Sequence, residues 1–220
     1  MPSFLDGDYS RYPGAIRETF PYLAGEACEL RQRWSVYHRL FIEDQRRTAI
    51  MGERLGRLLG LVQTITQDAM FLSIARLTDR DNLSQPNLSV WCLEEAIPFA
   101  ESPGFQNKVR QSLDSIWTAA DKIRKHRHKR IAHFDRNVSL KMELLPKVTV
   151  AEIRAFIEMI ESYLNLFFWE FDRRTMMFDM LSGQDITGTA EVSAIKAHVY
   201  DLLESNGTIP HGEWRGHWKA

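Results

Sequence analysis

Apolar residues recur at steps of three and four along several long stretches of this chain, and this periodicity constrains the fold more than any other feature. After Phe105 the recurring residues are Val109, Leu113, Ile116, Ala120 and Ile123. Such spacing places one apolar stripe along an α-helix. Two-residue alternation is weak and confined to residues 138–150, which contain Pro146. The pattern predicts an all-α protein.

Three further stretches have the same spacing. The first begins at Glu26 and contains Leu30, Trp34, Tyr37 and Phe41. The second contains Met51, Leu55, Leu58, Val62, Ile65, Ala69 and Leu72. The third follows Thr149 and Glu152, which have the spacing of a capping box, and contains Ile153, Phe156, Ile160, Leu164 and Phe167. We therefore expect an antiparallel bundle of four main helices with shorter additional helices. The second stripe can face a helix of the same chain or of a second chain, and we expect the same chain.

Breaks in this pattern suggest three parts. Residues 1–25 are rich in glycine and proline without a sustained period, which indicates an irregular lead-in. Residues 26–181 would form the bundle, with a turn-rich break at 79–87 and a short helix over about 88–99. Residues 182–220 would form a C-terminal helix and a tail.

The composition is that of a globular protein of the cytoplasm. Hydrophobic residues make up 44% of the chain and charged residues 26%, and there are two cysteines, too few for a disulfide framework. The N-terminal region contains Asp6 and Asp8, whereas a secretion signal begins with positively charged residues, so we expect no export signal. The most apolar stretch, residues 58–77, is interrupted by Asp68 and Arg76, so we expect no membrane span.

The segment Asp121–Arg136 differs from the rest of the chain in charge. It holds seven basic and two acidic residues, a net charge of +5, whereas the whole chain has −1, which leaves −6 for the remainder. A cationic patch on an acidic body is typical of phosphate recognition. The alternative is a solvated helix face.

Three histidines, His126, His128 and His133, lie within this basic segment. Histidine exchanges protons near neutral pH, and a neighbouring guanidinium can hold a phosphate and offset developing negative charge. Such groups can cleave RNA through its own 2′-hydroxyl without a metal ion or other cofactor. On a straight helix Arg127 and His133 lie about 120° apart. They could therefore converge only if the helix ends or bends between them, or if a second chain supplies half of the site.

Arg127 falls in register with the apolar stripe of its own helix. A guanidinium directed at such a seam is costly unless a carboxylate or a bound phosphate meets it. Arg76 continues the second stripe in the same way. We expect Arg76 and Asp79 to support the pocket, or Arg76 to form an ion pair with Asp79 or Asp68.

The segment RHKRIAHFD, Arg127 to Asp135, resembles the signature of HEPN domains, in which a histidine follows an arginine after four to six residues. Together with the residues from Ala75 to Asp79, an aromatic-rich first helix and the all-helical pattern, it is similar to the abortive-infection U-type branch, the AbiU2-like HEPN proteins.

This resemblance implies a homodimer in which two such motifs face one another and form a composite endoribonuclease site. Arg127 and His133 would be the catalytic pair, with His128 in the polar place after the arginine. Many relatives are toxins or antiviral effectors, and others have lost activity and serve as binding partners.

We therefore expect a metal-independent endoribonuclease that acts in bacterial antiviral defence or as a toxin. Its expected partners are RNA and a cognate antitoxin. The RNA backbone would be held by His128, Lys129, Arg130, Arg124 and Lys125. One alternative is a non-catalytic module that binds RNA or a partner protein through the same patch. A weaker alternative is a metal site formed by the three histidines, although positions i and i+2 of a helix point in roughly opposite directions.

Overall fold

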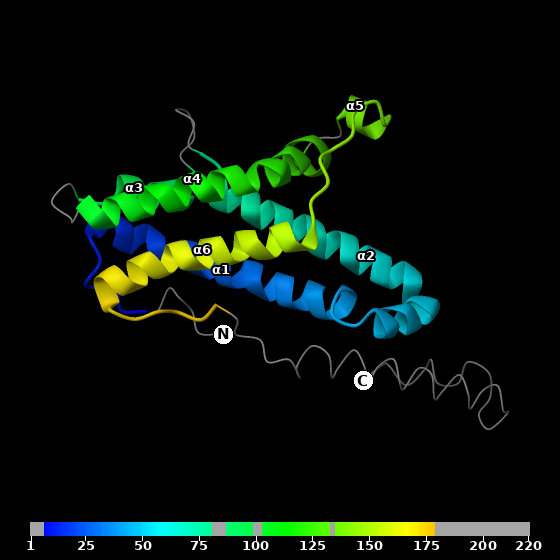
Figure 1. Cartoon of the computed structure of the whole chain (residues 1–220), viewed down its shortest axis with the longest axis horizontal. Coiled ribbons are helices and arrows are strands. Elements are labelled where there is room, and N and C mark those ends of the chain that lie inside the picture. Colours follow the sequence, from blue (N-terminus) through cyan, green and yellow to red (C-terminus); the bar gives the residue numbers. More distant parts are fainter. Residues whose placement is uncertain (1–6, 81–86, 99–102, 133–134, 179–220) are drawn as a thin grey trace, which may run out of the picture. The chain divides into compact units, whose positions relative to one another are not determined.

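The computed structural model describes residues 7–80, 87–98, 103–132 and 135–178, and these residues are helical with no strand among them (Figure 1). The helices in chain order are α1 (Gly14–Phe41), α2 (Gln45–Thr78), α3 (Val90–Glu95), α4 (Pro103–His126), η2 (Arg127–Ala132), α5 (Arg136–Ser139) and α6 (Val150–Asp172). The prediction of an all-α chain with four main helices is confirmed. The helix and tail expected within residues 182–220 lie outside the described residues.

The chain divides into two compact units. The first comprises Met1–Ser35 and Leu61–Met180, and the second comprises Val36–Gly60 and Leu181–Ala220. In the described part of the second unit, α1 ends and α2 begins after a short turn. The hydroxyl of Thr48 donates to the carbonyl oxygens of Leu40 and Asp44 there, at 3.0 and 2.9 Å.

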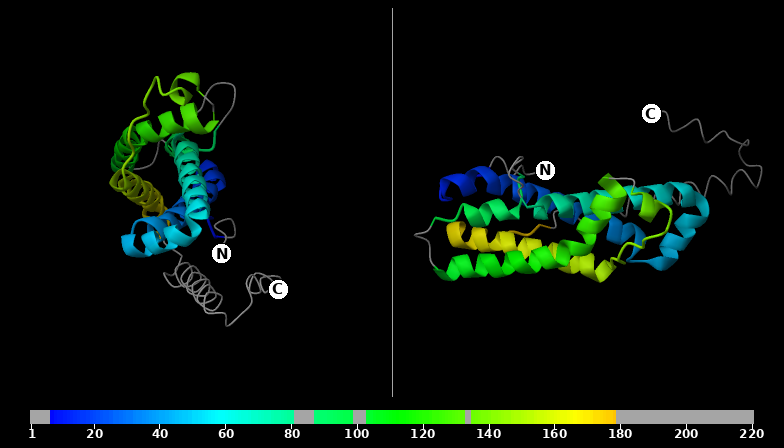
Figure 2. Two further views of the ribbon diagram at one scale, coloured as in Figure 1. Left: turned by 90° about the vertical axis from the view of Figure 1, so that its right-hand side faces the viewer. Right: turned by 90° about the horizontal axis from the view of Figure 1, so that it is seen from above.

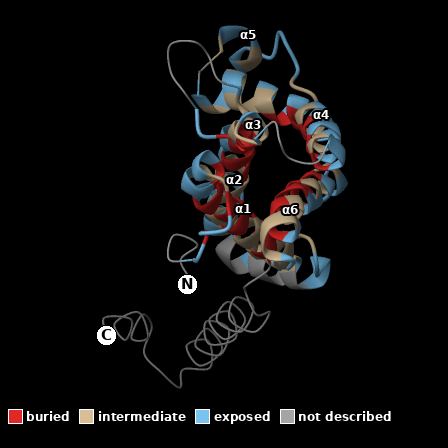
Figure 3. Cartoon of the chain, turned by 90° about the vertical axis from the view of Figure 1, so that its left-hand side faces the viewer, coloured by how far each residue is buried: buried red, intermediate tan, exposed pale blue. Residues whose placement is uncertain are grey.

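The first unit is an antiparallel bundle built on contacts between neighbouring long helices. Phe20 of α1 packs against Phe167 of α6, and Phe105 of α4 packs against the same ring, with centroid separations of 5.8 and 5.3 Å. Within this unit α4 and α6 run side by side in each view (Figure 2). Buried residues lie on the facing sides of the helices (Figure 3).

The apolar stripes predicted for α4 and α6 form the core. Every member of both stripes is buried, from Val109 to Ile123 in α4 and from Ile153 to Phe167 in α6. Thr149 caps α6 through a complete capping box, in which its hydroxyl accepts from the backbone N–H of Glu152 while the Glu152 carboxylate accepts from the backbone N–H of Thr149. Local sequence therefore determined both the face and the start of α6.

Helix α1 begins at Gly14, so the irregular lead-in predicted for residues 1–25 is too long. The helix contains Pro21, which cannot donate a backbone hydrogen bond. Its apolar stripe compensates, because the residues at alternating steps of four and three are buried from the first turn onward: Ile16, Phe20, Leu23, Ala27, Leu30 and Trp34. Burial contributes about 2 kcal/mol for each large side chain, so these side chains together outweigh the cost of about 3 kcal/mol for an internal proline.

Helix α2 differs most from expectation, because its predicted stripe is largely exposed. Leu58, Ile65 and Leu72 are 55%, 58% and 36% exposed, whereas the buried face carries Met70 and Ile74. The side chains of Met51 and Leu55 lie outside the described residues. The expectation that this stripe packs within the chain is therefore wrong for these three leucine and isoleucine residues. Periodicity identifies an apolar face but does not identify the surface that covers it.

Part of α2, Gly56–Thr78, is long and apolar enough to cross a membrane by length and composition alone. In the first unit its carboxyl-terminal half packs against the other helices, with Met70, Ile74 and Leu77 fully buried. Asp68 and Arg76 of the same segment form ion pairs with Arg130 and Glu26. This half of the segment is thus a core helix of the bundle.

Candidate functional site

The basic segment lies where the α-helical winding of α4 changes. Helix α4 ends at His126, and the chain continues as the π-helix η2 from Arg127 to Ala132. A π-helix has i→i+5 hydrogen bonds and often occurs at functional sites. The helical geometry thus changes at Arg127, the first of the two residues that the sequence predicts to be catalytic. His133 itself lies outside the described residues.

Arg127 forms an ion pair with a carboxylate that directly follows α2. Its Nη2 lies 3.0 Å from Oδ2 of Asp79, and the side chains of Arg127 and Asp79 are 37% and 23% exposed. Asp79 directly follows the last residue of α2, and its backbone N–H donates to the carbonyl oxygen of Ala75 at 2.7 Å. The guanidinium of Arg127, which continues the apolar stripe of its helix, is thus half-buried and paired with a carboxylate. A charge directed at an apolar stripe needs such a partner.

Arg76 is separate from this pair. Its Nη2 lies 2.6 Å from Oε1 of Glu26 in α1, and its side chain is 60% exposed. Asp68, its other expected partner, accepts from Arg130 of η2. The predicted ion pairs of Arg76 with Asp79 or Asp68 are therefore wrong, because Arg76 points toward α1 whereas both aspartates face the basic segment. The structure brings Asp79, but not Arg76, to Arg127.

The remaining predicted RNA contacts of the segment have different surroundings. His128 is exposed. Lys129 forms an ion pair with Glu143, and Arg130 forms one with Asp68. Lys125 lies 2.8 Å from Asp121, which holds the pKa of that carboxyl below its usual value. Most of the expected phosphate contacts are thus already partnered by carboxylates at the surface, where such pairs exchange readily.

Arg124 is largely buried, unlike a typical surface phosphate contact. Its guanidinium carbon lies 3.5 Å from the centroid of Trp117, and its side chain is 15% exposed. Burial lowers the pKa of Arg124, against the opposing effects of Asp121 and Asp79. Its Nη1 is buried without a hydrogen-bond partner among the described residues.

The same place contains three side chains that the sequence did not single out. Arg80 lies over the rings of Trp91 and Trp117, with its guanidinium carbon 4.1 and 4.5 Å from their centroids. Trp91 of α3 donates from its indole nitrogen to the carbonyl oxygen of Thr78 at 3.2 Å. The sequence indicated this cluster only through the position of Arg80 directly after Asp79. It did not predict that α3 packs against α4, which brings the two tryptophans together.

The structural role of His126 was also not predicted from the sequence. Its Nε2 lies 2.7 Å from the carbonyl oxygen of Pro146, and its ring packs edge-on against Phe71 at 5.4 Å. His126 therefore joins the end of α4 to the segment that leads into α6. Within the described part of the chain, no group of three or more His, Cys, Asp or Glu side chains is placed to hold a metal ion.

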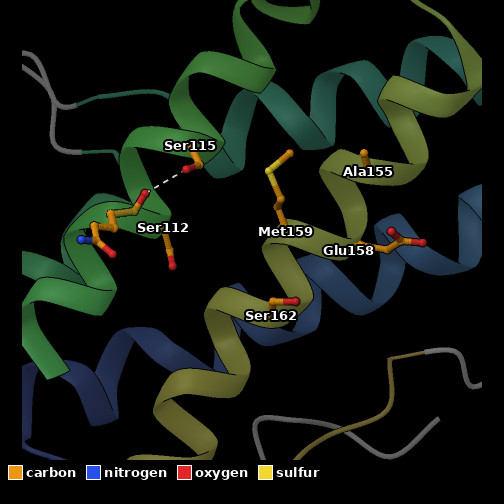
Figure 4. Close-up of a pocket in the computed structure, with 7 residues that line it drawn as sticks. Ser112, Ser115, Ala155, Glu158, Met159 and Ser162 are labelled. Atoms are coloured by element: carbon orange, nitrogen blue, oxygen red, sulfur yellow. Dashed lines mark hydrogen bonds between the residues drawn. The ribbon is translucent and has the colours of Figure 1, made fainter. Parts of the chain in front are cut away.

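A groove of about 490 Å³ lies elsewhere on the bundle, between α4 and α6 (Figure 4). It is lined by Gln111, Ser112, Ser115, Ala155, Glu158, Met159 and Ser162. The hydroxyl of Ser115 donates to the carbonyl oxygen of Gln111 in its own helix at 3.0 Å. The one charged lining residue is a carboxylate, so this groove does not suit a phosphate.

Comparison with known protein families identifies a match over most of the chain. The sequence model of the family HEPN_AbiU2, described as AbiU2, matches residues 14–190. No curated protein and no solved structure matches the chain. The matched region begins with α1 and includes Asp79 and the whole basic segment.

Proposed function

Because the chain belongs to the AbiU2 family of HEPN proteins, a family of modules related to abortive infection, we propose that it is a metal-independent endoribonuclease. It would act in the bacterial cytoplasm, as an antiviral effector or a toxin held in check by a cognate antitoxin. The observation that carries the proposal is the half-buried ion pair of Arg127 with Asp79 at the start of η2.

The proposed reaction uses the RNA's own 2′-hydroxyl. The 2′-oxygen attacks the neighbouring phosphorus, and the bond from phosphorus to the 5′-oxygen breaks. The two His133 side chains of a dimer serve as the base that removes the 2′ proton and the acid that protonates the leaving oxygen. Arg127 offsets the charge that develops on the phosphate oxygens. The products are a 2′,3′-cyclic phosphate and a free 5′-hydroxyl.

A dimer is supported by the exposed apolar face of α2 in the first unit. Leu61, Ile65 and Leu72 are 57%, 58% and 36% exposed and lie at steps of four and seven along the helix. Asp68, which occupies the remaining position of this stripe, forms the ion pair with Arg130 of η2. An apolar face of this kind is suited to self-association, and it adjoins the basic segment. A second copy packed on it would bring the two basic segments near each other.

Incubation of the full chain with end-labelled RNA in excess chelator tests the enzyme. Wild-type protein is expected to yield fragments ending in cyclic phosphate, and Arg127→Ala and His133→Ala are each expected to reduce the rate at least a hundredfold. Arg110→Ala is the matched control, because Arg110 is a 76% exposed arginine of α4 outside the basic segment. Undiminished cleavage by both variants would end the proposal.

A non-catalytic module that binds RNA or a partner protein is the second candidate. The observation in its favour is that Lys129 and Arg130 pair with carboxylates at the surface, where such pairs exchange readily and a phosphate or an acidic partner can replace the carboxylate. It predicts RNA binding that weakens with salt, because phosphate contacts release counterions, together with no turnover. Cleavage that depends on Arg127 would exclude it.

A further inference from the structure

Arg80, Trp91, Trp117 and Arg124 form one layered cluster, which we call the Trp–Arg ledge. The two indole rings meet edge to face with a centroid separation of 5.9 Å. Arg80 lies over both rings, and Arg124 lies over Trp117. Three elements build the ledge, since Trp91 belongs to α3, Trp117 and Arg124 belong to α4, and Arg80 follows α2. Figure 1 shows α3 and α4 together in this part of the first unit.

The ledge adjoins the proposed catalytic arginine. Arg80 is the chain neighbour of Asp79, whose carboxylate pairs with Arg127, and Arg124 precedes Arg127 by three residues. The charge of Asp79 also acts on Arg124. The ledge and Arg127 are therefore parts of one continuous surface.

The groups that form the ledge and pair with its neighbour Arg127 include more cations than carboxylates. Four cations, Arg80, Arg124, Lys125 and Arg127, stand against two carboxylates, those of Asp79 and Asp121. Lys125 engages Asp121 at 2.8 Å and Arg127 engages Asp79 at 3.0 Å. The excess of two positive charges favours an anionic ligand.

The outer layer of the ledge is suited to a planar ligand. Arg80 is exposed and its guanidinium lies against the indoles, whereas Trp91 and Trp117 are half-buried. Nucleobases of single-stranded RNA stack on aromatic rings and on guanidinium planes, while cations beside them hold the backbone. A base on Arg80 would extend the existing stack by one layer.

We propose that the Trp–Arg ledge is a nucleobase subsite, which stacks an unpaired base of single-stranded RNA on Arg80 beside the phosphate held at Arg127. This rests on the proposed function, since it names how that site takes its substrate. It also explains why an exposed arginine, rather than an apolar residue, covers two tryptophans at this position.

Binding of uncleavable oligonucleotides tests the subsite independently of catalysis. The probes are a fluorescein-labelled 2′-O-methyl oligouridylate of 12 nucleotides and a backbone of equal length that lacks its bases, titrated with the full chain by anisotropy. Arg80→Lys keeps the charge and removes the planar surface. It is expected to weaken binding of the base-bearing probe about tenfold and to change binding of the abasic probe less than twofold.

Arg110→Lys is the matched control, and it is expected to leave both affinities unchanged. Far-UV circular dichroism checks that Arg80→Lys folds. Equal losses for both probes, no loss for either, or failure of the wild type to bind the base-bearing probe would each overturn the subsite. Cleavage by the wild type without a base-specific loss would refute the subsite alone. A base-specific loss without cleavage would refute only the proposed ribonuclease.

Discussion

His126 Nε2 lies 2.7 Å from the carbonyl oxygen of Pro146, so the last residue of α4 holds the segment that leads into α6. Since a carbonyl only accepts, the ring donates from Nε2. Its Nδ1 is buried without a hydrogen-bond partner among the described residues. The ring thus combines one satisfied nitrogen with packing against Phe71.

Replacement of His126 is therefore expected to destabilise the bundle. His126→Ala removes a hydrogen bond and ring packing, with an expected loss of about 2 kcal/mol in the free energy of unfolding. His126→Phe is expected to lose less, because it keeps the ring and removes the unpartnered nitrogen. Urea denaturation measures both, and His128→Ala, an exposed position two residues away, is the control. A larger loss for phenylalanine than for alanine would contradict this assignment.

Asp79 is expected to position Arg127 rather than to bind RNA. Asp79→Asn removes the charge that holds the guanidinium, so kcat for RNA cleavage is expected to fall about tenfold. KM is expected to stay equal or decrease, because one negative charge leaves a phosphate-binding surface. Steady-state kinetics separate the two quantities. Glu94→Gln, which removes a carboxylate paired with Arg110, is the control, and a raised KM with unchanged kcat would argue against positioning.

Glu152 is expected to make stability depend on acid pH. The Lys122 ammonium, followed by the backbone N–H and hydroxyl of Thr149, lowers the pKa of Glu152 to about 2 from 4.5. A pKa lowered by folding stabilises the protein above the unfolded value, and this contribution is lost as pH falls from about 4.5 to about 2. Wild type should therefore exceed Glu152→Gln in thermal midpoint at pH 7, and the gap should narrow at pH 3. Glu158→Gln in the same helix is the control, and a constant gap would contradict the expectation.

The exposed face of α2 is expected to carry the dimer contact. Ile65→Glu places a charge in an apolar contact twice per dimer and should weaken self-association about a hundredfold, with cleavage lost in parallel. Light scattering across a dilution series measures the oligomeric state. Trp169→Glu, at a 56% exposed apolar position of α6, is the control. Full cleavage by a monomer would refute the composite site.

Local sequence was sufficient to predict most of the helices and to identify the basic segment as the candidate site. The sequence predicted the apolar stripes of α4 and α6, the capping box at Thr149 and the register of Arg127. Helical periodicity and capping depend on residues within a few positions of one another, so they can be recognised without knowledge of the fold. The family match agrees with the resemblance found in the segment from Arg127 to Asp135.

Contacts between residues far apart in the chain could not be predicted from the sequence. The sequence showed that Arg127 needs a counter-charge, but only the antiparallel packing of α2 on α4 brings Asp79 to it from 48 positions away. The same packing exposes Ile65 and buries Met70, and it joins Arg80 to Trp91 and Trp117. Sequence determined which residues form helices and where the basic segment lies. Tertiary structure decided which faces meet, because that choice depends on the fit of whole helix surfaces rather than on any local pattern.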